Sequence, residues 1–156
     1  MTTLTIGQSI PHFSLPSTTD QPFQLSDYLD QQALVIYFYP KDNTPGCTTE
    51  GQDFRNLYPQ FKALNVEIVG VSRDSVVSHS KFKTKLNLPF ALLSDTDETI
   101  CKLFDVIKLK TLYGKTSLGI ERSTFLIDKQ GILRQAWRKV AVKDHAQTVL
   151  EAARTL

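Results

Sequence analysis

The sequence has few cysteines, little excess charge and no long hydrophobic run. Its 156 residues include two cysteines, Cys47 and Cys101, which are too few for the disulfide framework of a small secreted protein. Eighteen lysines and arginines against 16 acidic residues give a formal net charge of +2, which offers no electrostatic basis for binding nucleic acid or an anionic membrane. The longest apolar stretch, residues 33–39, is far too short to span a bilayer.

Signals for targeting and for metal binding are also scarce. Residues 1–13 contain neither a basic segment nor a long apolar run, so the sequence predicts no signal peptide, and we expect a cytoplasmic protein whose thiols stay reduced. The three histidines, His12, His79 and His145, share no ligand spacing with either cysteine, which argues against a zinc site. A cysteine in this chain is therefore expected to be catalytic or redox-linked, or else part of the core.

The composition is typical of one globular domain. Hydrophobic residues make up 41% of the chain and charged residues 22%, which excludes a disordered or low-complexity protein. No repeat or long linker interrupts the sequence. We therefore expect residues 1–156 to form a single domain.

Hydrophobic patterns predict alternating strands and helices. Residues 33–39 are a continuous apolar run, typical of a strand that is buried on both faces of a sheet, and residues 66–72 are expected to form a second buried strand. The other expected elements are short strands before residue 30 and at 89–93, helices at 48–64, 75–86, 96–104 and 143–156, and a hairpin formed by 123–127 and 132–137. Pro59 is expected to kink or break the first helix, and Leu156 to face inward on the last. Residues 106–119 have no clean period and are expected to form a surface excursion.

This order of elements indicates the fold class. Strands joined by right-handed helical crossovers form a parallel sheet, and the hairpin adds antiparallel strands at its edge. The sequence therefore predicts an α/β protein with a thioredoxin-like fold, in which a central mixed sheet is covered by helices on both faces.

Cys47 lies directly after a predicted strand and turn, at the opening of a helix. The unpaired N–H groups and the positive end of the dipole at a helix start favour a thiolate over a thiol. The alternative is a small apolar residue packed beneath the turn. The polar surroundings, rich in glycine and proline, favour the reactive interpretation.

Three segments resemble one enzyme family. Residues 39–50, YPKDNTPGCTTE, resemble the active-site loop of peroxiredoxins of the bacterioferritin comigratory protein (peroxiredoxin Q) subfamily. Residues 88–95, LPFALLSD, and 119–128, GIERSTFLID, are similar to the same subfamily and occur in the same order. The resemblance implies a thioredoxin fold and a thiol peroxidase that needs no metal, haem or flavin.

The resemblance also implies roles for individual residues. Pro40, Thr44 and Cys47 match the family's proline, threonine and peroxidatic cysteine, and Arg122 matches its catalytic arginine. Arg122 would stabilise the negative charge that develops on sulfur and oxygen as the thiolate attacks a peroxide. Thr44 would orient the peroxide, and Pro40 would shield the sulfur from water. Taken alone, the arginine suggests a surface ion pair, and the proline and threonine suggest ordinary loop residues.

Two further residues of the loop have supporting roles in this interpretation. Backbone amides near Gly46 and Cys47 would donate hydrogen bonds to the reacting oxygens. Glu50 matches a glutamate common in the family and could organise the start of the helix. It could equally be an acid in the first turn of a helix, where the dipole favours negative charge.

The sequence departs from the family at the resolving cysteine. Many members carry that cysteine five residues after the peroxidatic one, where this chain has Gln52. Cys101 is the other cysteine in the chain, but its neighbours Ile100, Leu103 and Phe104 suggest a buried residue. We therefore expect a one-cysteine mechanism, with an atypical two-cysteine mechanism through Cys101 as the alternative.

The function expected from the sequence is reduction of hydrogen peroxide and organic hydroperoxides through a Cys47 sulfenic acid. An external thiol such as glutathione, a glutaredoxin or thioredoxin would then regenerate the cysteine. We expect a monomer with no nucleic-acid or membrane partner. One alternative is a redox-sensing interaction protein, which would consume about one peroxide per chain. Another is a thiol–disulfide oxidoreductase, against which the missing second cysteine of a C-x-x-C motif argues.

Overall fold

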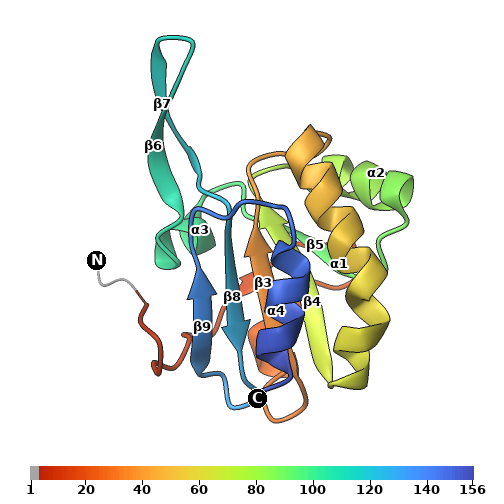
Figure 1. Ribbon diagram of the computed structural model, residues 1–156. Helices are drawn as coiled ribbons and strands as arrows, with labels where there is room; N and C mark the ends of the chain where they lie inside the picture. The colour runs from red at the N-terminus through yellow and green to blue at the C-terminus, as the bar shows by residue number, and fades with distance from the viewer. Residues whose placement is uncertain (1–3) are drawn as a thin grey trace.

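The computed structural model describes residues 4–156, apart from the side chain at position 112. Its centre is a five-stranded sheet in the order β5-β4-β3-β8-β9 (Figure 1). The strands are β3 (Ala33–Phe38), β4 (Val66–Ser72), β5 (Ala91–Ser94), β8 (Ser123–Ile127) and β9 (Leu133–Trp137). Strands β3, β4 and β5 are parallel, whereas β8 and β9 form an antiparallel hairpin beside β3. The predicted mixed sheet is confirmed.

Helices cover the two faces of this sheet unequally. Helices α1 (Pro45–Ala63), α2 (Val76–Leu86) and α4 (His145–Ala153) pack on the face to which Val35 and Tyr37 point. The opposite face, to which Ile36 and Phe38 point, is covered by the short helix α3 (Thr99–Leu103) and by the N-terminal segment. That segment contains β1 (Ser14–Leu15), β2 (Phe23–Gln24) and the 3-10 helix η1 (Leu25–Asp27). Because β3 has a core on each side, all six of its residues are buried.

The expectation that Pro59 breaks the first helix is wrong, because α1 continues to Ala63. A proline inside a helix removes one backbone hydrogen bond and costs about 3 kcal/mol. Pro59 is exposed, and the helix is anchored on either side of it by Phe54 and Phe61, which are both fully buried. The packing of these two rings keeps the helix continuous.

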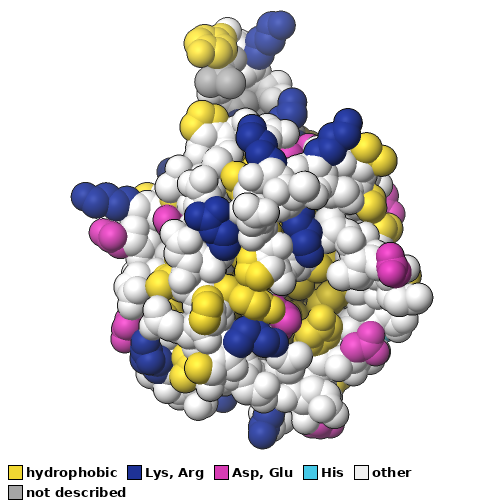
Figure 2. Space-filling view, turned by 90° about the vertical axis from the view of Figure 1, so that its right-hand side faces the viewer, with side chains coloured by type: hydrophobic (Ala, Val, Ile, Leu, Met, Phe, Trp, Pro, Cys, Tyr) yellow, Lys and Arg dark blue, Asp and Glu magenta, His cyan; other side chains and the backbone are white. Residues whose placement is uncertain are grey.

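Residues 107–120 form a hairpin that the sequence analysis did not predict. Strand β6 (Ile107–Leu112) pairs antiparallel with β7 (Lys115–Ile120). The two residues between them, Tyr113 and Gly114, both have positive φ (52° and 76°), as the tight turns of two-residue hairpins require. The hairpin projects from the body, in agreement with the expected surface excursion, and its far end carries both basic and hydrophobic side chains (Figures 1 and 2).

The remaining predicted helices are present but shorter. Helix α3 covers five residues of the expected 96–104, and α4 begins at His145 rather than at 143. Leu156 lies beyond the end of α4 and is 46% exposed, so the expectation that it faces inward is wrong. Within residues 4–156, no helix has both the length and the apolar character needed to cross a membrane.

Candidate active site

Cys47 is the third residue of α1 and lies at the end of the loop that follows β3. Thr44 is the N-cap of this helix and Pro45 its first residue. The first backbone hydrogen bond of the helix runs from Thr48 N to Thr44 O (2.9 Å). The N–H groups of Gly46 and Cys47 precede this bond and have no partner within the helix. They therefore present two donors next to the sulfur, whose residue is only 2% exposed.

The Thr44 hydroxyl does not accept a hydrogen bond from the N–H groups of Gly46 and Cys47. An N-cap threonine usually accepts a hydrogen bond from an amide of the first turn, but this side chain makes no such capping bond. Thr44 Oγ1 instead donates to Lys41 O (2.8 Å). Its oxygen is thus oriented as an acceptor, while the amides of Gly46 and Cys47 remain free to bind a ligand oxygen.

The guanidinium of Arg122 connects the sulfur to a buried carboxylate. Arg122 lies between β7 and β8, and Val140 N donates to its carbonyl oxygen (2.9 Å). Its Nη2 donates to Cys47 Sγ (3.5 Å), and its Nη1 donates to Glu50 Oε1 (2.7 Å). The planar fork of the guanidinium makes both contacts at once, which a lysine ammonium could not do in the same geometry.

Glu50 lies three residues after Cys47, on the same side of α1, and is 1% exposed. Its second oxygen, Oε2, is buried and has no hydrogen-bond partner in the part of the chain that the structure describes. Burial raises the pKa of Glu50 to about 7, although the Arg122 guanidinium opposes the shift. Glu50 is therefore a buried carboxylate whose principal contact is the guanidinium that it orients.

A glycine at position 46 allows this arrangement. A Cβ atom on Gly46 would come within 3.0 Å of Arg122 Nη2, closer than nearly all real contacts of this kind. The guanidinium can lie over the start of α1 because position 46 has no side chain. The glycine thus contributes space as well as an amide.

Arg122 also lines a surface cavity of about 330 Å³ that opens toward solvent. The other ionisable residues of its lining are Lys108, Lys110, Lys139 and Glu121. Cations outnumber the single acid, so a small polar or anionic molecule would meet a favourable potential on its way to the guanidinium.

The structure brings four of the predicted site residues into one cluster: Cys47, Arg122, Glu50 and Gly46. Thr44 caps the same helix, and Pro40 lies half-buried in the loop between β3 and α1. Within residues 4–156, neither of the latter forms a hydrogen bond with the Cys47 sulfur.

Cys101 lies on the other side of the sheet. Cys47 belongs to the core that contains Val35 and Tyr37, whereas Cys101 belongs to the core that contains Ile36 and Phe38. Cys101 is fully buried in α3, and its backbone N–H donates to Asp95 Oδ2 (2.6 Å). Burial, followed by the neighbouring Asp95, raises the pKa of the Cys101 thiol far above its usual range, so this sulfur is a poor nucleophile.

Sequence reasoning missed His145, which lies close enough to Arg122 to be affected by its charge. Thr124 Oγ1 and His145 Nε2 are 2.8 Å apart in the core. Burial and the Arg122 guanidinium lower the pKa of His145 to about 4, so the ring is neutral at pH 7. His145 is a single histidine at the start of the C-terminal helix, and no local sequence motif indicates that it lies near Arg122.

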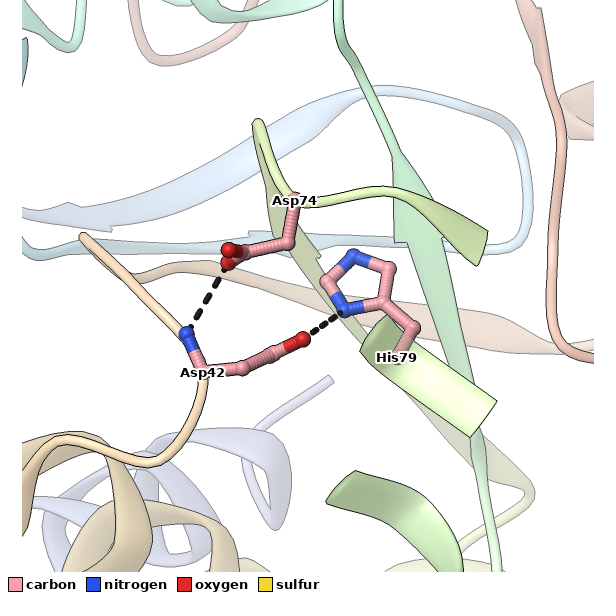
Figure 3. Close-up of side chains that lie close together, drawn as sticks. All are labelled: Asp42, Asp74 and His79. Atoms are coloured by element: carbon pink, nitrogen blue, oxygen red, sulfur yellow. Dashed lines mark hydrogen bonds and ion pairs between the residues drawn. The ribbon is translucent and has the colours of Figure 1, made fainter. Parts of the chain in front are cut away.

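The described residues include one group with the composition of a metal site: Asp42, Asp74 and His79 (Figure 3). Their potential ligand atoms lie within 4.8 Å of one another. Asp42 Oδ2 and His79 Nδ1 contact each other (2.8 Å), and Asp74 Oδ2 accepts a hydrogen bond from Asp42 N (2.9 Å). These contacts describe a hydrogen-bonded network that is complete without an ion.

Comparison with known proteins identifies the family. Residues 6–136 match the AhpC/TSA family. Peroxiredoxin Bcp of Bacillus subtilis is 53% identical over 154 residues, which cover 99% of this chain and 96% of that protein. The structure of a Xylella fastidiosa PrxQ mutant superposes with a TM-score of 0.93 at 46% identity, covering 99% and 98% of the two chains. A structure of the Xanthomonas campestris bacterioferritin comigratory protein, described in terms of alkyl peroxide reduction, gives 0.86 at 51% identity over 92% and 90% of the chains.

A thioredoxin-like fold with a cysteine at a helix start beside an arginine defines a class of thiol-dependent redox proteins. The chain belongs to the AhpC/TSA family, and within it to the peroxiredoxins of the Bcp (PrxQ) type, which are thiol peroxidases. The resemblance seen in the sequence is thereby confirmed.

Replacing Glu50 with glutamine should flatten the dependence of stability on pH. A carboxyl group whose pKa rises from 4.5 to about 7 on folding binds its proton more tightly in the folded state, so the wild type loses stability as the pH rises through this range. The free energy of unfolding, measured by urea denaturation between pH 5 and pH 8, should fall more steeply for the wild type than for Glu50→Gln. Equal slopes would show that Glu50 does not titrate in this way.

Proposed function

We propose that the protein reduces hydrogen peroxide and organic hydroperoxides with Cys47 as the nucleophile and an external thiol as the electron donor. The observation that carries this proposal is the contact of 3.5 Å between Cys47 Sγ and Arg122 Nη2 at the start of α1. This contact supports the proposal because a permanent positive charge beside a cysteine sulfur favours its reaction as a nucleophile, and the chain belongs to the AhpC/TSA family.

In the first step the Cys47 thiolate attacks one oxygen of the peroxide. A sulfur–oxygen bond forms while the oxygen–oxygen bond breaks, and the other oxygen leaves with the electron pair as hydroxide or alkoxide and takes a proton from water. The products are a Cys47 sulfenic acid and water or an alcohol, so the sulfur is oxidised by two electrons. Arg122 and the amides of Gly46 and Cys47 stabilise the negative charge that spreads over sulfur and oxygen.

The residues around the sulfur prepare this step. Glu50 orients the Arg122 guanidinium, and Thr44 Oγ1, with its own hydrogen donated to Lys41, accepts the hydrogen of the incoming peroxide. Pro40 has no N–H group and would shield the sulfur without adding a competing donor. Positioned donors of this kind lower the barrier because they need no rearrangement when the charge develops.

The sulfenic acid is then reduced by a thiol from outside the chain. A thiolate attacks the oxidised sulfur and displaces hydroxide, which takes up the proton that the thiol had lost and leaves as water. A second thiol then attacks the resulting mixed disulfide and frees Cys47. Glutathione, a glutaredoxin and thioredoxin are the candidate donors. The one-cysteine mechanism is favoured because Cys101 belongs to the core on the opposite face of the sheet, and we propose that the enzyme works as a monomer.

Cys47→Ser should abolish peroxide turnover with every thiol donor, because a serine hydroxyl is not ionised at neutral pH. Peroxide consumption should be measured with glutathione, glutaredoxin and thioredoxin systems in parallel. Cys101→Ser serves as the matched control and should retain most of its turnover. If Cys47→Ser kept more than a few per cent of the wild-type rate, another group would be the nucleophile.

Arg122→Lys should slow oxidation of Cys47 at least ~10-fold, or ~1.4 kcal/mol in the barrier, because an ammonium cannot contact the sulfur and Glu50 with the same fork. The rate constant for peroxide should be measured by stopped-flow under single-turnover conditions. Arg134→Lys, at an exposed ion pair with Asp128, provides the control. An unchanged rate in Arg122→Lys would rule out a specific role for the guanidinium.

One equivalent of peroxide should leave Cys47 as a sulfenic acid and Cys101 as a thiol. The strands of the sheet separate the two side chains, and a disulfide requires Cα atoms within about 7 Å of each other. A sulfenate-specific reagent followed by mass spectrometry of the peptides should locate the label on Cys47. A peptide pair linked through Cys47 and Cys101, with a loss of two hydrogens, would instead indicate an atypical two-cysteine enzyme.

A further inference from the structure

The loop that carries the site is anchored by a buried network that the proposed reaction does not use. The loop runs from Tyr39, at the end of β3, to Thr44, at the start of α1. Asp42, in its middle, is buried and faces His79 of α2, which is fully buried (Figure 3). The network thus joins the active-site loop to an element far from it in sequence.

The contacts of the His79 ring determine where its protons lie. His79 Nε2 is 2.9 Å from Leu93 O, a carbonyl oxygen that can only accept, so Nε2 carries a hydrogen. His79 Nδ1 is 2.8 Å from Asp42 Oδ2, which is also an acceptor when the carboxyl is ionised. The Tyr39 hydroxyl, which donates to Asp42, is also 3.3 Å from Nδ1. A ring with hydrogens on both nitrogens would satisfy the acceptors on its two sides, and this geometry is the basis of the proposal below.

The other partners of Asp42 support an ionised carboxylate. The Tyr39 hydroxyl donates to Oδ1 (2.6 Å), and the Ser78 hydroxyl donates to Oδ2 (2.7 Å). The hydrogen bonds from His79, Tyr39 and Ser78 keep the pKa of Asp42 below its usual value although burial opposes them. A protonated carboxyl group would give up part of this set of acceptor contacts.

A second acid faces the same network. Asp74, between β4 and α2, accepts hydrogen bonds from Asp42 N (2.9 Å) and from Ser72 Oγ (2.5 Å). In the part of the chain that the structure describes, His79 is the one basic side chain that contacts Asp42. Without a charge on His79, the carboxylates of Asp42 and the half-buried Asp74 would lie close together with no cation beside them, which is unfavourable because Asp42 is buried.

We propose that His79 is a positioning residue for the peroxidase reaction, acting as a buried imidazolium that holds Asp42 and thereby the loop from Tyr39 to Thr44. The proposal rests on the proposed function, since this loop contains Pro40 and Thr44 and leads directly into the first turn of α1, where Cys47 lies. The Asp42 side chain contacts His79, and its backbone N–H donates to Asp74. A charge on the His79 ring therefore helps to fix the position of the loop backbone at Asp42. His79 itself touches no reacting atom.

Paired substitutions separate the charge of His79 from its shape. His79→Gln leaves Asp42 ionised without a cation, and we expect oxidation of Cys47 by peroxide to slow at least ~10-fold. Adding Asp42→Asn removes the unpaired negative charge, so the double variant should recover most of the lost rate. His12→Gln, at an exposed histidine, is the control and should react like the wild type. A double variant as slow as His79→Gln alone would overturn the proposal, because a role of shape alone predicts no recovery.

A measurement on the wild-type protein tests the charge directly, whether or not the variants fold. Nitrogen-15 NMR of the histidine rings at pH 7 should show both nitrogens of His79 carrying hydrogens. In Asp42→Asn the amide can donate to Nδ1, and His79 should become neutral, with a hydrogen on Nε2 alone. A neutral ring in the wild type would overturn the proposal. The two failures can be told apart. If the proposed function were wrong, the wild type would consume no peroxide even though NMR showed both nitrogens of His79 carrying hydrogens.

Discussion

The arrangement of the site depends on one guanidinium that reaches two groups of the same helix. Arg122 lies 75 positions after Cys47 in the sequence, and its two terminal nitrogens bind the sulfur and the Glu50 carboxylate. The start of α1, the connection between β7 and β8 that carries Arg122, and the absence of a side chain at Gly46 all contribute to this contact. Without the guanidinium, negative charge on the sulfur would depend on the helix dipole and the free amides of the first turn for stabilisation.

Buried ionisable pairs are costly, and this protein has one within the active-site loop and another in the helix that follows the loop. Glu50 faces Arg122 after the loop, and Asp42 faces His79 within it. Pairs of this kind contribute little to net stability, but removal of one partner is strongly unfavourable. Their value is geometric, because each pair has few alternative arrangements and so restricts the backbone between them. In this view electrostatics as well as packing shapes the segment from Asp42 to Glu50.

Much of the fold could be predicted from the sequence because the central strands are buried on both faces. The continuous apolar run of β3, the largely apolar segment of β4 and the turn signal between β8 and β9 together predict the mixed sheet. The hairpin β6–β7 lacked such a signal because much of it is solvent-exposed, so no alternation of buried and exposed residues marks it. The helix continues through Pro59 because the cost of a proline is local, whereas the burial of Phe54 and Phe61 that outweighs it depends on the whole helix.

The site itself was predictable only in part. The position of Cys47 after a strand and a turn indicates a reactive thiol from local chemistry alone. Arg122 required the family resemblance, because no local pattern reveals a contact across 75 positions. His79 has the spacing of a core residue on α2, and the sequence cannot distinguish a core histidine from one paired with a carboxylate in a distant loop. The missing information in both cases is long-range contact.

The position of the two cysteines on opposite faces of the sheet has a kinetic consequence. When no second sulfur of the same chain is in reach, the sulfenic acid persists until a donor arrives, and its lifetime varies inversely with the donor concentration. A sulfenic acid that waits can react with another peroxide and pass to the irreversible sulfinic state. The fraction of enzyme lost in each cycle is then set by a competition between peroxide and thiol in the surrounding solution. The enzyme would be protected against inactivation by its supply of reductant, and a cell that depletes its thiols would lose this peroxidase at the moment when peroxide accumulates.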